Sequence, residues 1–272
     1  MVRKIILLFG ILLSIVGCED PIDVDLNENP SLLVVEAYVN WIKETKQTEQ
    51  VVKLSTLSPY FSSQKNAVRG ATVYITDEAA RAYRFQETET PGHYLPLDTV
   101  PYVVAHQFTL HIEHQQQRYE ATETFQTVAS INRVEQEALT FFGRDALKFE
   151  VYSFDPPEKE NYTYFKFSSP KLDAPEYNVY RDDFTNGLEY YGILVDSDFE
   201  VGDSIQFRQV GLSPRAYTYW NVLILQNTRQ GGPFQPPPVN LTGNVVNLTQ
   251  PEVSPLGYFR ISEVSEVHYV VE

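Results

Sequence analysis

Apolar and polar residues alternate in short segments along the chain, and this alternation predicts β-strands. Apolar side chains occupy every second position at 71–75, 108–112 and 147–151, which is the period of a strand with one buried face. Turn-forming pairs such as Pro91-Gly92 separate such segments at intervals of about ten residues, as in antiparallel sandwiches. Apolar or aromatic runs predict further strands at 32–39, 162–167, 191–195 and 205–210.

The strand pattern divides into two sets and predicts a mainly β protein. We expect an immunoglobulin-like β-sandwich over residues 27–128. We expect a second β-rich domain, sandwich-like or barrel-like, over residues 132–272. Asp155-Pro156-Pro157 ends one of its strands, because consecutive prolines cannot continue a hydrogen-bonded ladder.

One helix is predicted at about 214–230, inside the second domain. Ser213 suits the N-cap and Pro214 the first helical position. Apolar side chains follow at helical spacing, and Gly231-Gly232-Pro233 ends the pattern. The simplest interpretation of the Tyr and Trp side chains on this helix is packing against the sheet.

A long segment, 226–256, shows no periodicity and contains many Pro and Gly residues. Arg229 is the only charged residue between Ala216 and Pro251, whereas disordered linkers are usually charged and poor in large apolar groups. The segment therefore lies either over the protein's own surface or against a partner. The candidate partner-contact residues are Arg229, Phe234, Pro236, Pro237, Pro238 and Asn244.

The first 17 residues have the features of a signal peptide. Arg3 and Lys4 precede twelve mostly apolar residues, too few to span a bilayer and typical of a signal-peptide core. Gly17 then precedes Cys18, the single cysteine of the chain. The arrangement resembles the bacterial lipobox, which implies cleavage before Cys18 and lipidation of that residue. The alternative is an ordinary secretory signal followed by a coincidental cysteine.

An acidic tether, residues 18–26, follows the cysteine. Glu19 and Asp20 resemble the signal that exports lipoproteins to the cell surface in Bacteroidetes. Two alternatives are a signal for retention at the inner membrane and a solvated linker that carries no sorting signal. We therefore expect a lipid-anchored protein of the outer membrane that faces the outside of the cell.

Composition and motifs exclude several classes of function. The 272 residues carry 21 Lys and Arg against 36 Asp and Glu, a net charge of −15, so nucleic acid is not an expected partner. One cysteine permits neither an intrachain disulfide nor a cysteine-based zinc site. Motif searches find no nucleophile elbow, no zinc-protease motif and no phosphate loop. We expect no cofactor, no metal site and no catalytic residue.

Several segments resemble one family in order and spacing. They are the start CEDPIDVDL (18–26), VRGATV (68–73), PGHY (91–94), FDPPEKENYTY (154–164), DDFTNG (182–187), GGPF (231–234), PPP (236–238), GNV (243–245) and LGYF (256–259). These motifs are similar to those of the Bacteroidetes lipoproteins catalogued as domain of unknown function 4249. Thr163 departs from the family, which often has a second Tyr after Tyr162, and so does His93. The resemblance implies a surface lipoprotein encoded beside a TonB-dependent outer-membrane transporter, and it defines no catalytic residue.

The expected function is that of a non-enzymatic accessory subunit of a TonB-dependent transporter, which captures or presents a nutrient whose identity is unknown. One alternative is a surface hydrolase with carboxylates drawn from Asp182, Asp183, Asp196 and Asp198, which requires two carboxyls about 5–9.5 Å apart if the substrate is a glycoside. Another is a free-standing glycan-binding, peptide-binding or adhesive lipoprotein.

Overall fold

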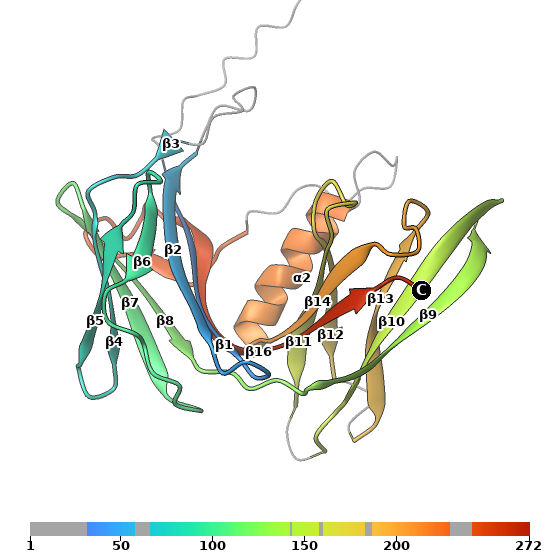
Figure 1. Cartoon of the computed structure of the whole chain (residues 1–272). Helices are drawn as coiled ribbons and strands as arrows, with labels where there is room; N and C mark the ends of the chain where they lie inside the picture. Colours follow the sequence, from blue (N-terminus) through green and yellow to red (C-terminus); the bar gives the residue numbers. More distant parts are fainter. Residues whose placement is uncertain (1–31, 58–65, 142, 158–159, 183–186, 229–240) are drawn as a thin grey trace, which may run out of the picture. The chain divides into compact units, whose positions relative to one another are not determined.

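The computed structural model describes residues 32–57, 66–141, 143–157, 160–182, 187–228 and 241–272. These ranges contain sixteen strands and one helix, which confirms the prediction of a mainly β protein (Figure 1). The elements are β1 (Leu33–Ile42), β2 (Thr48–Thr56), β3 (Asn66–Ala67), β4 (Thr72–Asp77), β5 (Ala82–Glu87), β6 (His93–Pro96), β7 (Gln107–His114), β8 (Gln117–Thr124), β9 (Ile131–Phe141), β10 (Arg144–Phe154), β11 (Tyr162–Ser168), β12 (Glu176–Arg181), β13 (Glu189–Asp196), β14 (Ser204–Gly211), α2 (Pro214–Thr228), β15 (Val245–Asn247) and β16 (Leu256–Val270).

Strands β1 to β8 form a first sandwich. β2 pairs with β1 and β6, while β7 pairs with β4 and β8. These are the A-B-E and C-F-G pairings of immunoglobulin-like sandwiches. Val73 and Ile75 of β4, opposite Ile112 and Leu110 of β7, enter one hydrophobic core, as their alternation predicts.

The second half of the chain builds three layers. The sheet β13-β10-β9 contributes Phe149 and Leu194 to a core that also contains Phe165 and Phe207 of the sheet β12-β11-β14-β16. Helix α2 covers the other face of this second sheet (Figure 1). The middle sheet is therefore buried on both faces, and this explains why its strands carry aromatic residues in both orientations.

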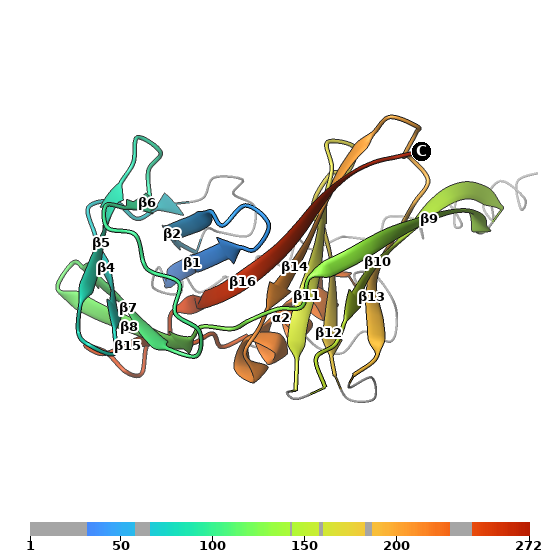
Figure 2. The ribbon, with the colours of Figure 1, turned by 60° about the horizontal axis from the view of Figure 1, so that its bottom comes forward.

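Strand β16 belongs to both halves of the fold, and Figure 2 shows its length. Its residues 256–264 pair in parallel with β1, and its residues 264–270 pair antiparallel with β14. Strand β15, which also comes from the second half of the chain, pairs with β8. The two predicted domains therefore share one continuous sheet, and residues Ser31–Glu272 form a single unit.

The predicted helix is present as α2, which ends at Thr228. Ser213 caps it, since the Ala216 amide donates a hydrogen bond to the Ser213 hydroxyl at 3.2 Å. The Ser213 hydroxyl in turn donates to the buried Glu123 carboxylate, which also accepts a hydrogen bond from Tyr258. The cap thus ties the start of α2 to both β8 and β16.

Candidate functional site

Most of the residues that the sequence indicated for anchoring or partner contact lie outside the described ranges. They are Cys18, Glu19, Asp20, Arg229, Phe234, Pro236, Pro237 and Pro238. Within the described residues, no helix is long and apolar enough to cross a membrane.

Asn244 is described, and its position does not suit a partner contact. Its side chain is 3% exposed. Its amide nitrogen donates to the Phe259 carbonyl at 2.7 Å, and its amide oxygen accepts from the Phe259 amide at 2.9 Å. With Val245 in the hydrophobic core, this part of the segment lies over the protein's own first sandwich.

A cavity of about 660 Å³ lies where β1 and β16 leave the first sandwich and α2 covers the second sheet. Strand alternation explains its lining. Glu36, Tyr38 and Asn40 point away from the core residues of β1, and Tyr164 and Lys166 point away from those of β11. Strands β2, β12, β14 and β16 and helix α2 supply most of the rest, so sequence-distant residues meet there.

One wall of the cavity is aromatic. Trp220 of α2 lies 4.8 Å from Tyr164 and 5.8 Å from Tyr177, measured between ring centroids. Tyr219 lies 4.9 Å from Tyr258 of β16. The aromatic face of the helix therefore packs on the sheet, as predicted, and also lines the cavity. The indole nitrogen of Trp220 is buried and has no hydrogen-bond acceptor within the described ranges.

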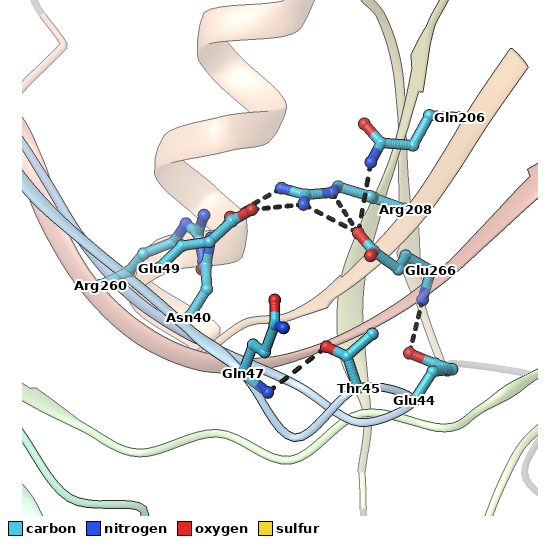
Figure 3. Close-up of polar contacts among 9 residues, drawn as sticks. All are labelled: Asn40, Glu44, Thr45, Gln47, Glu49, Gln206, Arg208, Arg260 and Glu266. Atoms are coloured by element: carbon cyan, nitrogen blue, oxygen red, sulfur yellow. Dashed lines mark hydrogen bonds and ion pairs between the residues drawn. The ribbon is translucent and has the colours of Figure 1, made fainter.

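A charged network centred on Arg208 also borders the cavity (Figure 3). The Arg208 guanidinium donates two hydrogen bonds to the carboxylate of Glu49 and a further one to Glu266 at 2.8 Å. The bond to Arg208 is the main cause that holds the pKa of Glu49 below its ordinary value. These contacts join β2, β14 and β16.

Arg260 extends the network without a carboxylate partner. Its guanidinium is buried, 7% exposed, and donates a hydrogen bond to the neutral side chain of Asn40 at 2.6 Å. It lies 5.4 Å from the ring of Tyr38 and 5.5 Å from that of Tyr164, distances at which a cation interacts with an aromatic face. Among the described residues, Arg260 has no ion pair.

Lys166 lies opposite Arg208 in the β11/β14 ladder and lines the same cavity. It is half-buried, and its ammonium makes no hydrogen bond or ion pair with any residue that the structure describes. Burial is the main cause that lowers its pKa, and Arg208 and Arg260 lower it further. Together with Lys53 from β2, four cations line a cavity in a chain that is strongly acidic overall.

A second group of interest is a buried pair of carboxyls at one end of the second sandwich. Asp155 accepts a hydrogen bond from Asn161 at 2.9 Å and lies beside Asp182. Neither carboxylate oxygen of Asp182 has a donor among the described residues. Burial, followed by the neighbouring Asp182, raises the pKa of Asp155 to about 6, because one proton relieves the repulsion between two buried carboxylates.

The carboxylates named for a hydrolase do not converge. Asp182 lies beside Asp155, which follows Phe154, whereas Asp196 lies opposite Leu147 at the other end of β10. That separation is roughly 25 Å along the strand, far beyond the 5–9.5 Å that glycoside hydrolysis uses. The Asp196 carboxylate accepts a hydrogen bond from the amide of Asp198, which closes a local turn. Asp183 lies outside the described residues.

A shared middle sheet and an aromatic and cationic cavity define a two-sandwich β protein with a ligand-sized pocket. The chain belongs to the family described as domain of unknown function DUF4249, whose model matches residues 19–267. The family resemblance read from the sequence is thus confirmed. A comparison with curated proteins finds no match.

Two solved structures are among those that resemble the chain. A two-domain fibronectin type III segment of chicken tenascin is 12% identical, with 68% of this chain and 92% of that chain covered and a TM-score of 0.21. A pullulanase complexed with maltotriose, from Anoxybacillus sp. LM18-11, is 11% identical, with 64% of this chain and 24% of that chain covered and a TM-score of 0.20. These TM-scores are too low to support an inference about fold or function.

Proposed function

We propose that the protein is a lipid-anchored, non-enzymatic binding protein of the outer-membrane surface that captures a nutrient in its cavity for a TonB-dependent transporter. The observation that carries the proposal is the cavity itself. Its volume of about 660 Å³ lies within the range of small-molecule sites, about 300–1,000 Å³. Its lining combines an aromatic wall with a few convergent polar groups, which is the usual composition of such sites.

The rigidity of the cavity supports a binding role. Arg208 links three strands around it, and the Ser213 cap fixes the start of α2 against β8 and β16. A preorganised site loses less conformational entropy when a ligand binds, so more of the contact energy appears as affinity.

The anchoring half of the proposal rests on the N-terminal sequence. Two or three acyl chains on Cys18 make membrane attachment stable, whereas a single one is marginal. Confinement to the membrane raises the effective concentration of the protein beside a transporter in the same membrane. The candidate contact residues Arg229, Phe234, Pro236, Pro237 and Pro238 remain a proposal for the surface that meets the transporter.

The experiment is a purification of the C-terminally tagged full chain from its native outer membrane in mild detergent, followed by identification of the proteins that co-purify. A TonB-dependent transporter in stoichiometric amount is the expected result. A Cys18→Ala variant is the control and should lose both membrane attachment and the transporter. Recovery of the wild-type lipoprotein alone would contradict the transporter role.

A further inference from the structure

Four cations line the cavity, and two of them, Arg260 and Lys166, form no ion pair with any residue that the structure describes. Arg208 is compensated by Glu49 and Glu266. Arg260 donates a hydrogen bond to the neutral Asn40 and lies over two aromatic rings, and Lys166 makes no hydrogen bond or ion pair with a described residue. Glu49 acts on both cations at longer range, but its carboxylate is already paired with Arg208. Desolvated cations without counter-charges destabilise a folded protein. Their presence in an acidic chain points to a binding partner that supplies the missing negative charge.

The surrounding carboxylates limit how much negative charge the site accepts. Glu36 also lines the cavity, and it lies directly opposite Lys53 in the β1/β2 ladder. Glu49 is close enough to Lys166 to raise its pKa, against the lowering by burial and by the arginines. A singly charged group such as a carboxylate fits this balance, whereas a dianion meets repulsion from Glu36 and Glu49.

The aromatic wall adds a second recognition element beside these cations. Tyr177 and Trp220 both line the cavity, with their rings stacked 5.8 Å apart and inclined by 26° to each other. Flat apolar faces of this kind pack against rings of a ligand. The indole N–H of Trp220 is buried and lacks an acceptor among the described residues.

We propose that the cavity binds a ring-containing organic acid, whose ring packs against Tyr177 and Trp220 and whose carboxylate lies between Lys166 and Arg260. This inference rests on the proposed binding role of the cavity and specifies the chemistry of its ligand. A uronic-acid sugar and an aromatic acid both present this chemistry, and the test separates them.

The test measures affinity by isothermal titration calorimetry on the detergent-solubilised full chain with two matched pairs of probes. One pair is D-galacturonate and D-galactose, and the other is phenylacetate and 2-phenylethanol. In at least one pair the acid should bind at least tenfold more tightly than its neutral analogue, which is the selectivity expected of one hydrogen bond to a charged group. The pair that shows this difference identifies the sugar or the aromatic source.

A Lys166→Met variant keeps the length of the side chain and removes its charge. It should lower the affinity for the acid about tenfold and leave the affinity for the neutral analogue unchanged. Lys148→Met is the matched control, because Lys148 lies on β10 and pairs with Glu137 and Glu150, away from the cavity lining. It should change neither affinity.

Proton uptake provides an independent measurement. An anion beside Lys166 raises its lowered pKa, so binding measured over a series of alkaline buffers should take up protons in the pH range where Lys166 titrates, and should not do so in Lys166→Met. Titrations in two buffers of different ionisation enthalpy detect this uptake, which a purely structural lysine would not produce.

Three results would overturn the inference. Equal affinity for the acid and the neutral member of both pairs would remove the anion requirement while leaving a binding cavity. An equal loss of both affinities in Lys166→Met would assign Lys166 to packing. Binding of no probe at all would reject this ligand class, and the purification of the transporter complex would then decide the proposed function separately.

Discussion

Gly257 allows β16 to enter the sheet beside β1, and replacing it with alanine should disrupt the joint between the two sandwiches. Gly257 has a φ of +93°, a region that side chains with a Cβ rarely adopt. A methyl group built on it would lie 1.9 Å from the Val35 carbonyl oxygen, where ordinary contact begins at 3.4 Å. Val35 cannot move away, because β2 pairs with β1 on its other side.

The expected loss of unfolding free energy in Gly257→Ala is the sum of two separate costs. The positive φ costs about 1–2 kcal/mol for a residue with a Cβ, and forcing an extra methyl into a closely packed joint costs about 1–3 kcal/mol. Gly257→Ala should therefore lower the free energy of unfolding by about 2–5 kcal/mol, a large part of the 5–15 kcal/mol that stabilises a typical protein.

Gly202→Ala is a matched control. Gly202 has a φ of +96°, and nothing lies within 4 Å of a Cβ built there. Gly202→Ala should lower the free energy of unfolding only by the cost of the positive φ, about 1–2 kcal/mol. Urea denaturation followed by far-ultraviolet circular dichroism measures both variants. Equal destabilisation would refute the argument that the close approach of β16 to Val35 determines the cost.

Three further variants test the contacts around the cavity and the buried carboxyls. Arg208→Leu leaves Glu49 and Glu266 without their cation and should cost about 3 kcal/mol in urea denaturation. The double variant Arg208→Leu with Glu49→Leu should recover part of this loss, and no recovery would show that the ion pair is not the cause. Ser213→Ala removes the cap of α2 and should cost about 1 kcal/mol in the same assay, and an unchanged midpoint would contradict the cap. Because the pKa of Asp155 is raised to about 6, its protonated form stabilises the fold at low pH, and this contribution is lost as the pH rises from about 4 through 6. Asp155→Asn should therefore gain stability relative to the wild type between pH 4 and pH 7, and a pH-independent difference would refute the shift.

The sequence revealed strands with one exposed face by their alternation and more deeply buried strands such as β1 and β11 by their apolar or aromatic runs. Strands β4 and β7 alternate clearly because their outer faces meet solvent, and α2 was recognised from its cap and its helical spacing. Strand β16 was not predicted, because residues 257–265 are all buried and the buried polar residues Arg260, Ser262 and Glu263 interrupt the apolar run. One of its faces fills the core of the first sandwich and the other meets α2 and the cavity, so no alternation is visible.

The cavity was not predicted, since its residues are brought together only by the shared strand. Asn40 and Arg260, which hydrogen-bond each other, are 220 positions apart. Arg260 lies in a segment without a strand pattern, and a lone arginine in such a segment is usually a surface residue. The aromatic side chains of α2 were the one visible signal, and they indicated packing as much as binding.

Recovery of the natural ligand tests directly whether the cavity is the binding site. The complex purified from the native outer membrane is denatured to release bound small molecules, which are then titrated against the purified full chain and against Trp220→Ala. A released molecule should bind the wild type and quench its tryptophan fluorescence. The Trp220→Ala variant should show an unchanged circular dichroism spectrum and should not bind this molecule in calorimetry. Equal binding by the folded Trp220→Ala variant would contradict the assignment of the cavity as the binding site.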